Sequence, residues 1–551
     1  MRALIVDGYI DEPAAFGVPP YVSPYIRYLA GALVVHDVEV DYVTIDRMRK
    51  ESLWEIANEY DFLFVFGGIT VPGRYKGGTP LTLSELQRIL SITRRPTKIV
   101  GGPIVGGYSL RGGSVARRFD IQADYLVSGD MEAFVVSYFR GVPDPEAKSD
   151  YELIDAVAPY GAVVLEKHPN FPHVICEIEV SRGCERRTFC SFCTEPLLHG
   201  RLKSRDVQAI LKEIESLYMT GCRAFRFGRA ANILAFGSDK NGGKPSPEIV
   251  EELYSGTREV APHLEVLHTD NANPSYLVTH ERECRKIVET IVRYNTPGDV
   301  FSFGVESFDE SVLKKNNIQG SPEEFLKAIA IVNEIGGVRV DGIPKLLPGV
   351  NLIFGLPGET EETLKKNYSY LKRILEEGYL LRRINIRKLL AYPGTPVYEY
   401  LKNRKHRIKS HLHDHWKRKI REEIDHEMLK RVFPAGTVLK KVIVEYREGK
   451  ISFGRQLGSY PILVGVPGNH GGVLDVVVVS HGERSVTALP FPSFINSMSL
   501  EELTAIPGIG NALAKKIILN RPFRSWGDLE KVVPAETVNF LRKLGISLQQ
   551  V

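Results

Sequence analysis

The chain of 551 residues lacks any run of about 18 apolar residues, the length that a helix needs to cross a bilayer. Its first residues, Met1–Val6, lead directly into Asp7 instead of into the apolar core of a secretory signal. Both absences predict a soluble, cytoplasmic protein with no membrane partner. Hydrophobic residues make up 43% of the chain and charged residues 25%, and these proportions exclude a disordered or fibrous protein.

Cysteine is scarce as well: the chain has six, and none of them precedes Cys176. So few cysteines in so long a chain exclude a disulfide-stabilised scaffold. Three of the six stand close together in the sequence. In a reducing compartment, a tight cysteine cluster indicates metal or redox chemistry.

Charge is nearly balanced overall but is unevenly distributed. The whole sequence has 71 basic and 67 acidic residues, a net charge of +4. Residues 401–551 contain 24 basic and 14 acidic residues, which gives +10 and leaves −6 for residues 1–400. The positive C-terminal quarter predicts a polyanionic partner.

Strand and helix patterns predict a multidomain α/β protein. Residues 1–145 alternate short apolar strands with helices, and glycines follow several strands, which is typical of a Rossmann-like, doubly wound sheet. These glycines either admit a ligand or only turn the chain. After a linker at residues 146–169, residues 170–400 repeat strand and helix about six times, which favours a partial or complete parallel (β/α) barrel.

The C-terminal part has a different character. Residues 401–432 form a basic helical segment, which is either a binding surface or an ordinary solvated face. Residues 433–490 contain β-branched strands with glycine-rich turns and predict a small antiparallel barrel. Residues 497–551 predict two short helical pairs.

The cysteine cluster follows a predicted strand and has the spacing C-x5-C-x2-C, formed by Cys184, Cys190 and Cys193. Three thiolates on one loop can hold three irons of a cubane cluster and leave the fourth iron open. A structural zinc site or a fully ligated cluster needs a fourth ligand, and the other cysteines stand alone in the sequence. Zinc with a distant ligand and unligated thiols remain the alternatives.

This loop, with Phe192 before the last cysteine, resembles the cluster loop of the radical S-adenosylmethionine (radical SAM) superfamily. The resemblance implies that Cys184, Cys190 and Cys193 bind a 4Fe-4S cluster, that S-adenosylmethionine occupies the open iron, and that Phe192 lies near its adenine. It also implies a 5′-deoxyadenosyl radical and an electron donor such as ferredoxin or flavodoxin. The first gap is five residues here, whereas the family usually has three.

Later segments resemble the same superfamily in the expected order, namely residues 301–307, 350–360 and 387–396. Where many members carry Gly-Gly-Glu, this chain has Phe227-Gly228-Arg229. The resemblance covers residues 170–400. The cofactor-binding residues that it implies, besides Phe192, are Gly228, Glu306, Ser307, Phe354, Gly355 and Leu356.

Residues 1–145 resemble the cobalamin-binding-like domain that precedes the barrel in many members, through residues 99–103 and 124–133. The motif Asp-x-His-x-x-Gly, which supplies the lower cobalt ligand, is missing, and His36 is the histidine of this region. Two alternatives therefore stay open: a cobalamin site, and a retained fold without the cofactor.

Near the C-terminus, Pro507-Gly508-Ile509-Gly510 resembles the hairpin of the helix-hairpin-helix motif in nucleic-acid-binding proteins. Gly508 and Gly510 allow backbone N–H groups to contact a phosphate at the start of a helix. Lys515, Lys516 and Arg521 add positive charge along the same backbone. The alternative is a helical pair that serves only for protein packing.

These features together predict a radical SAM enzyme that modifies a nucleic acid by methyl or methylthio transfer or by a related C–H functionalisation. RNA such as tRNA is favoured over DNA, because the small barrel resembles the one appended to RNA methylthiotransferases. One alternative is a radical SAM enzyme acting on a small molecule or lipid. The other is a nucleic-acid-binding protein with a structural or sensory cluster.

Overall fold

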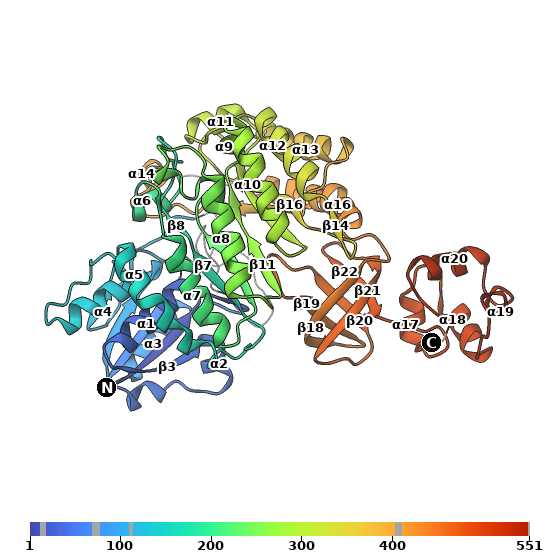
Figure 1. The fold of residues 1–551 in the computed structure, drawn as a ribbon, viewed down its shortest axis with the longest axis horizontal. Helices are drawn as coiled ribbons and strands as arrows, with labels where there is room; N and C mark the ends of the chain where they lie inside the picture. Colours follow the sequence, from blue (N-terminus) through green and yellow to red (C-terminus); the bar gives the residue numbers. More distant parts are fainter. Residues whose placement is uncertain (11–17, 69–77, 110–113, 403–409, 549–551) are drawn as a thin grey trace.

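A computed structural model describes most of the chain, and Figure 1 shows its parts following one another from the N-terminal sheet (blue) to the C-terminal helices (red). The described residues are 1–10, 18–68, 78–109, 114–402 and 410–548. Residues 403–409 of the predicted basic helical segment lie outside them. Across the described residues, no helix combines the length and the apolar composition that a membrane span requires.

The N-terminal sheet has five parallel strands in the order β3-β1-β4-β5-β6. Their bounds are β1 (Arg2–Gly8), β3 (Glu39–Thr44), β4 (Phe62–Gly67), β5 (Thr97–Gly101) and β6 (Tyr125–Val127). Helices α1 (Pro24–Val35), α3 (Leu83–Ile92) and α4 (Met131–Phe139) connect or follow these strands. Such an order confirms the doubly wound fold and puts the topological switch point between β1 and β4.

Local capping explains where the first helices begin. The Ser23 hydroxyl accepts a hydrogen bond from the N–H of Tyr25, and Pro24 occupies the first turn of α1. Thr82 and Glu85 form a reciprocal capping box at the start of α3.

The segment predicted as a linker, residues 146–169, is helical. It forms α5 (Tyr151–Val157) and a 3-10 helix (Ala158–Val164). Ile154 and Val157 are fully or almost fully buried, and they belong to the hydrophobic core that also contains much of α1. The segment therefore joins the N-terminal sheet to the next part through a shared core.

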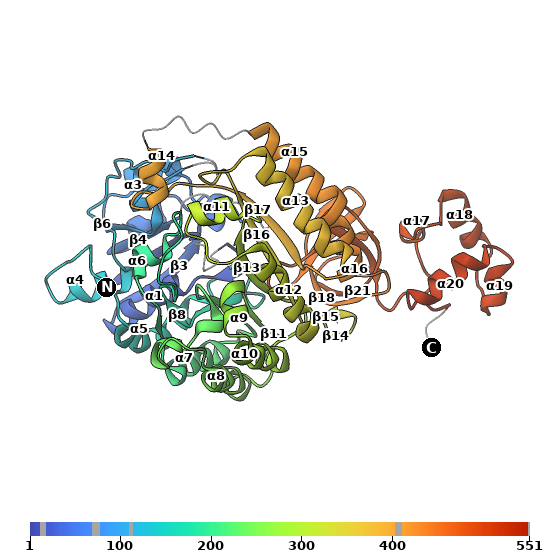
Figure 2. The same cartoon turned by 90° about the horizontal axis from the view of Figure 1, so that it is seen from above.

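A parallel half-barrel occupies the centre of the molecule, with helices on its outside (Figure 2). Its first strands are β7 (Ile175–Glu179), β10 (Ala224–Arg229) and β11 (Val266–Thr269). Its further strands are β12 (Asn271–Ala272), β13 (Asp299–Glu306), β16 (Leu346–Phe354) and β17 (Arg383–Lys388). The outer helices are α7 (Val207–Met219), α8 (Pro247–Val260), α10 (Glu281–Tyr294), α12 (Pro322–Gly336) and α13 (Glu361–Glu376).

One short strand of the half-barrel comes from the N-terminal part. β2 (Tyr21–Val22) pairs in parallel with the start of β7, with Tyr21 opposite Ile175. Within the described residues, β2 and β17 are the two edges of the half-barrel. The predicted parallel barrel is therefore the partial one, and it is open on one side.

The small barrel is closed, with the strand order β18-β19-β20-β22-β21. Its strands are β18 (Val438–Glu448), β19 (Ile451–Gln456), β20 (Leu463–Pro467), β21 (Val473–His481) and β22 (Ser485–Pro490). The sequence predicted an entirely antiparallel barrel, and this was wrong for one pair, because β20 and β22 run parallel. A closed five-stranded barrel with this order has the Greek-key arrangement of an OB-fold.

Helices α15 (Ser410–Ile420) and α16 (His426–Val432), with one π-helical turn between them, lead from the half-barrel to the small barrel. After the small barrel come α17 (Leu500–Ala505), α18 (Asn511–Leu519), α19 (Trp526–Glu530) and α20 (Ala535–Lys543). These last helices share a core with Val477, Val479 and Leu489 of the small barrel and lie at the far end of the molecule in Figure 1.

The loop between β19 and β20 closes the lower end of the half-barrel. Its Leu457 and Tyr460 pack against the first residues of β7 and β10. The Tyr460 hydroxyl donates to Asp270 (2.6 Å), and Arg226 inside the half-barrel donates to the Ser459 hydroxyl (3.0 Å). The small barrel thus supplies the floor under the carboxyl-end cavity described next.

Candidate active site

The three clustered cysteines line one cavity of about 370 Å³ at the carboxyl ends of the half-barrel strands. They lie on the loop that follows β7 and the short strand β8 (Ser181–Arg182). Ligands of open parallel sheets bind at this end, because loops and helix N-termini converge there. The structure therefore brings together the residues that the cysteine spacing predicted to act jointly.

The loop is fixed at its start by a buried charge network. Arg182 donates to Glu179 (2.8 Å) on β7 and to Asp130 (3.0 Å) from the N-terminal part. The next residue, Gly183, has φ +78°, and a Cβ there would lie 2.2 Å from the carbonyl oxygen of Arg201. Its N–H donates to Glu195 (2.7 Å). Glycine is required here because both the backbone conformation and the close approach exclude a side chain.

Burial raises the pKa of all three thiols, that of Cys184 to about 12. Arg186 donates to the Sγ of Cys190 (2.7 Å) and partly offsets this effect. The thiols are thus protonated in the free protein, and metal binding would release their protons. Within the described residues, no group of three or more His, Cys, Asp or Glu side chains is arranged to hold a single metal ion.

Two charged residues face the same cavity from the strands. Glu306, at the end of β13, has φ 62°, a conformation that non-glycine residues adopt only where the surroundings enforce it. Burial raises its pKa to about 7, although Arg387 and Arg186 favour its ionised form. Arg387, on β17, has a buried Nε atom with no hydrogen-bond partner among the described residues. Both groups are available to polar atoms of a bound molecule.

Sequence reasoning missed a set of polar residues around Glu185. Its carboxylate accepts hydrogen bonds from Asn232 (3.0 Å) and Asn273 (2.8 Å), which follow β10 and β12. Asn273 and Glu185 line the cavity. The available signal in the sequence was position: Asn273 directly follows β12, and Asn232 lies three residues after the end of β10.

Five of the predicted cofactor-binding residues do not line this cavity. They are Gly228, Ser307, Phe354, Gly355 and Leu356. A Cβ on Gly228 would lie 2.1 Å from both Arg226 and Glu177, so this glycine makes room for a buried ion pair. The N–H of Gly355 donates to Glu359 (2.8 Å). By contrast, Phe192 and Glu306 line the cavity.

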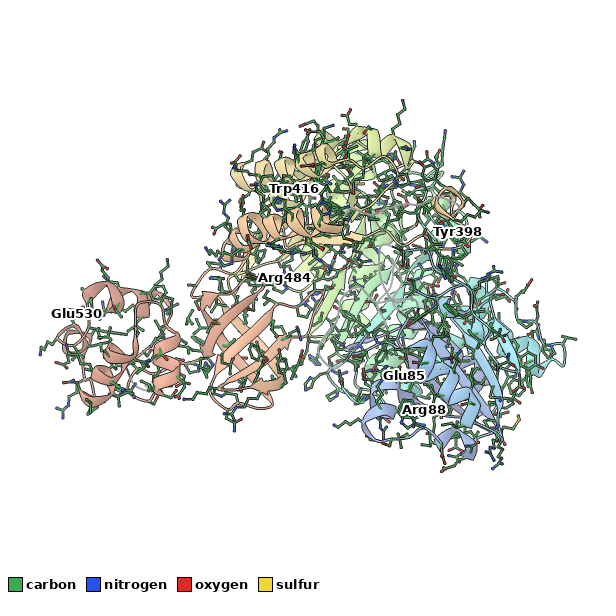
Figure 3. The ribbon with its side chains drawn as sticks, turned by 180° about the vertical axis from the view of Figure 1, so that it is seen from behind. Glu85, Arg88, Tyr398, Trp416, Arg484 and Glu530 are labelled. Atoms are coloured by element: carbon green, nitrogen blue, oxygen red, sulfur yellow. The ribbon has the colours of Figure 1, made fainter. Side chains whose placement is uncertain are left out.

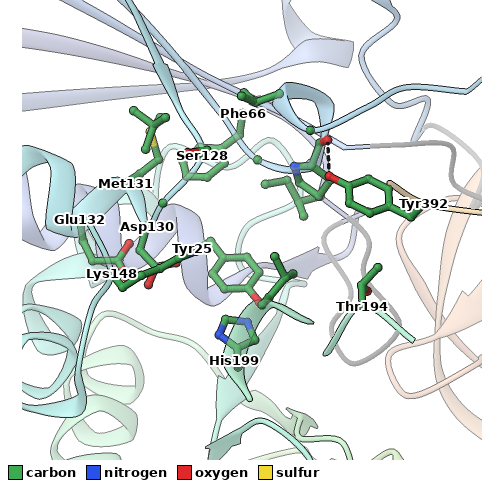
Figure 4. Close-up of a pocket in the computed structure, with 18 residues that line it drawn as sticks. Tyr25, Phe66, Ser128, Asp130, Met131, Glu132, Lys148, Thr194, His199 and Tyr392 are labelled. Carbon is green, nitrogen blue, oxygen red and sulfur yellow. Dashed lines mark hydrogen bonds between the residues drawn. The ribbon is translucent and has the colours of Figure 1, made fainter. Parts of the chain in front are cut away.

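A second cavity of about 170 Å³ lies at the carboxyl ends of the N-terminal sheet (Figure 4). Tyr392 donates across it to the carbonyl of Pro103 (3.2 Å). A Cβ on Gly101 would lie 2.7 Å from the sulfur of Met131, and one on Gly102 would lie 2.7 Å from a carbonyl of β4. These glycines serve close packing within the chain. The cavity volume of about 170 Å³ is below the roughly 300–1,000 Å³ of small-molecule pockets, so a corrin ring would require the cavity to widen.

The predicted hairpin joins α17 to α18. Gly508 has φ +87°, Gly510 is the N-cap of α18, and a Cβ at either would meet nothing within 4 Å. Lys515 and Lys516 are exposed on α18. Arg521 instead donates to the carbonyl of Met498 (2.7 Å) and is turned toward its own chain. The structure thus leaves four of the five predicted residues exposed.

Residues 178–371 match the family model for the radical SAM superfamily. This range contains the cysteine loop and the whole of five of the eight described strands of the half-barrel. The chain belongs to the radical SAM superfamily. It is therefore an enzyme of a group whose cofactors are a 4Fe-4S cluster and S-adenosylmethionine and which needs an electron donor. The resemblance read from the cysteine loop is confirmed.

Among its relatives, this radical SAM protein is 44% identical to an uncharacterised protein of Methanocaldococcus jannaschii over 88% of this chain and 92% of that one. It is 26% identical to the ribosomal protein uS12 methylthiotransferase RimO of Thermotoga petrophila, over 56% of this chain and 65% of the relative. It is also 26% identical to the tRNA-2-methylthio-N(6)-dimethylallyladenosine synthase of Fervidobacterium nodosum, over 41% and 46% of the two chains.

Among solved structures, the radical S-adenosylmethionine methyltransferase TsrM of Kitasatospora setae, with cobalamin and a 4Fe-4S cluster bound, is similar at a TM-score of 0.47. Its sequence is 14% identical, and the match covers 72% of this chain and 77% of that one.

Proposed function

We propose that this radical SAM enzyme modifies RNA, by methyl or methylthio transfer or by a related functionalisation of a C–H bond. The observation that carries the proposal is the exposed hairpin of Gly508 and Gly510 beside Lys515 and Lys516, because backbone N–H groups and lysines together suit a phosphate backbone. The OB-fold order of the small barrel supports it, since such barrels bind oligonucleotides. A relative named for a tRNA modification adds support.

In this proposal, Cys184, Cys190 and Cys193 hold the cluster, and S-adenosylmethionine occupies the cavity that they line. When bound, the two cofactors supply a 5′-deoxyadenosyl radical. Phe192 offers an apolar face to the adenine, while Glu306 and Arg387 bind polar groups from the opposite wall. The protein contributes position and exclusion of water, as is usual for cofactor enzymes.

The proposal also assigns domains. The N-terminal sheet acts as a wall of the site, the half-barrel carries the chemistry, and the two C-terminal units bind RNA. Their proposed ranges are 1–145, 170–400, 433–490 and 497–551, joined by residues 146–169 and 401–432.

The test is anaerobic reconstitution with iron and sulfide, reduction, and incubation with S-adenosylmethionine and total RNA from a strain that lacks the gene. We expect about four irons per chain, release of 5′-deoxyadenosine, and one new modified nucleoside detected by mass spectrometry. Cys193→Ala should abolish the 5′-deoxyadenosine. Cys284→Ala is the matched control, because Cys284 is buried on α10 and does not line the cavity.

The outcomes separate the parts of the proposal. Without a 4Fe-4S spectrum, or with equal activity of Cys193→Ala, the cysteine assignment fails. If 5′-deoxyadenosine forms but every nucleoside is unchanged, the RNA substrate is wrong. In that case, a parallel incubation with ribosomes from the same strain that yields a modified ribosomal protein would point to the substrate class for which RimO is named.

A further inference from the structure

A basic groove of about 470 Å³ lies beside the candidate active site, where β17, the α15–α16 segment and the small barrel meet. Figure 3 labels Arg484 where the small barrel meets the helices, below the helix that carries Trp416. The basic residues of the groove are Arg382, Arg383, Arg387, Lys417, Arg421, Arg455 and Arg484. Two acidic residues, Asp425 and Glu483, line it as well. The groove therefore carries an excess of positive charge.

Three of these seven basic residues have interaction partners within the protein. Arg421 pairs with Asp425, Arg455 pairs with Glu445, and Arg382 donates to the carbonyl of Tyr460. The other four basic residues of the groove form no ion pair with another described residue. They are Arg383, Arg387, Lys417 and Arg484, and the Arg383 guanidinium lies 3.6 Å from the ring centre of Tyr460.

The unpaired cations are close enough to disfavour one another. Burial within the groove lowers the pKa of Lys417, and the charges of Arg421, Arg484 and Lys388 lower it further. The pKa of Arg484 is lowered in the same way, by burial first and then by Arg421, although its side chain stays open to solvent. An anion in the groove would relieve this repulsion. The groove of the free protein therefore has a positive electrostatic potential that favours the binding of an anion.

The small barrel presents its ligand-binding side to the groove. Arg455 lies on the second strand, Leu463 begins the third, and Glu483 and Arg484 form the turn between the fourth and fifth. OB-folds bind oligonucleotides on the face of strands two and three and on this same turn. Tyr460 adds an aromatic ring at the edge of the groove. Aromatic rings beside cations suit unpaired bases and their backbone.

The groove reaches the candidate active site at one residue. Arg387 lines both the groove and the cavity of the three cysteines, and its Nε has no partner among the described residues. It stands on β17, the edge strand on the open side of the half-barrel. A chain lying in the groove would thus pass directly beside the cavity.

We infer that the basic groove binds the phosphate backbone of a single-stranded RNA segment and delivers one nucleotide past Arg387 into the cavity of the three cysteines. This rests on the proposed function as an RNA-modifying enzyme and adds the conformation of the substrate and its path.

The test uses the full-length holoenzyme and a 12-nucleotide, fluorescein-labelled single-stranded RNA, with binding followed by anisotropy over a range of KCl concentrations. The variant is Lys417→Gln with Arg484→Gln. Neither side chain has a hydrogen-bond or ion-pair partner among the described residues, so the substitutions leave no buried group without its partner. Each phosphate contact contributes about 0.7 to the slope of log K against log salt for single strands. The slope should therefore fall by about 1.4, which at 0.1 M salt weakens binding by about 25-fold.

The matched control is Lys212→Gln with Lys286→Gln, which removes the same charge from exposed positions on α7 and α10. This control should bind as the wild type does. Lys515→Gln with Lys516→Gln tests the hairpin separately.

Several results would overturn the inference. If the groove variant binds like the wild type while the hairpin variant is weakened, the groove is not the RNA path, although RNA modification stands. If a duplex of the same sequence loses affinity equally in the groove variant, the groove does not select single strands. If an acidic peptide displaces the RNA from the wild type but not from the groove variant, the groove serves a protein ligand. Absence of any salt-dependent RNA binding by the wild type would remove the proposed function as well.

Discussion

Glu213→Gln should destabilise the junction between the N-terminal part and the half-barrel. Glu213, on α7, accepts hydrogen bonds from Arg27 of α1 (2.5 Å) and from Arg205 (2.7 Å), and all three side chains are fully buried. Each carboxylate oxygen serves one guanidinium. In glutamine an NH₂ group replaces one oxygen and would face an N–H donor. Arg27 then loses its counter-charge, whereas Arg205 keeps its ion pair with Asp155 (2.8 Å).

Breaking a buried ion pair by removing one partner costs about 3–5 kcal/mol. Each kcal/mol shifts the melting temperature of a domain of this size by about 2–4 °C, so the first thermal transition of Glu213→Gln should fall by about 6–20 °C. This melting temperature is measured by far-ultraviolet circular dichroism of the metal-free protein. The control is Glu215→Gln, an exposed position on the same helix, which should stay within about 0.5 kcal/mol of the wild type.

A melting temperature of Glu213→Gln equal to that of Glu215→Gln would refute this reasoning. It would mean that Arg27 and Arg205 find other counter-charges or water, and that the two parts of the chain are not joined through this network.

Two further predictions concern the N-terminal sheet. Protein purified anaerobically from cells supplied with hydroxocobalamin should show no corrin absorbance, because the cavity at the end of the sheet has a volume of only about 170 Å³. A stoichiometric corrin spectrum would contradict this. Burial raises the pKa of Asp7 to about 6, so its ionisation is less favourable in the folded chain than in the unfolded one. The stability that the protonated form contributes is complete below about pH 4 and is lost by about pH 6, a change of about 3 kcal/mol. Urea unfolding of Asp7→Asn across this range should lack that change, and parallel pH profiles of the two proteins would disprove the assignment.

Much of the fold could be predicted because the local sequence pattern determines it. The alternation of strands and helices predicted both parallel sheets, and the cysteine spacing predicted three side chains in one cavity, because the loop after β7 lies at the carboxyl ends of the strands. The direction in which β20 and β22 pair could not be predicted, since alternation specifies a strand but not its neighbour. The pairing of Tyr21 with Ile175 could not be predicted for the same reason.

Only part of the basic groove could be predicted from the sequence. Residues 401–432, which supply Lys417 and Arg421, were predicted as a basic segment that is either a binding surface or a solvated face, but their meeting with β17 and the small barrel was not predicted. Its cations come from β17, from the helical segment and from a turn of the small barrel, and the chain between them carries no motif that links them. By contrast, the hairpin was predictable because its residues are adjacent and its glycines have a specific backbone role. Functions built from neighbouring residues leave a sequence signal, whereas functions built by folding do not.

The loop that runs from Leu457 to Tyr460 constrains how this protein can be engineered. A fragment ending before the small barrel would uncover Arg226 and its carboxylate partners, Glu177 and Asp270, which lie beneath the cavity of the three cysteines. Water would then reach Arg226 and these two carboxylates from the side that the small barrel now covers. The catalytic part and residues 433–490 therefore have to be transferred together, even in a design that needs only the radical chemistry.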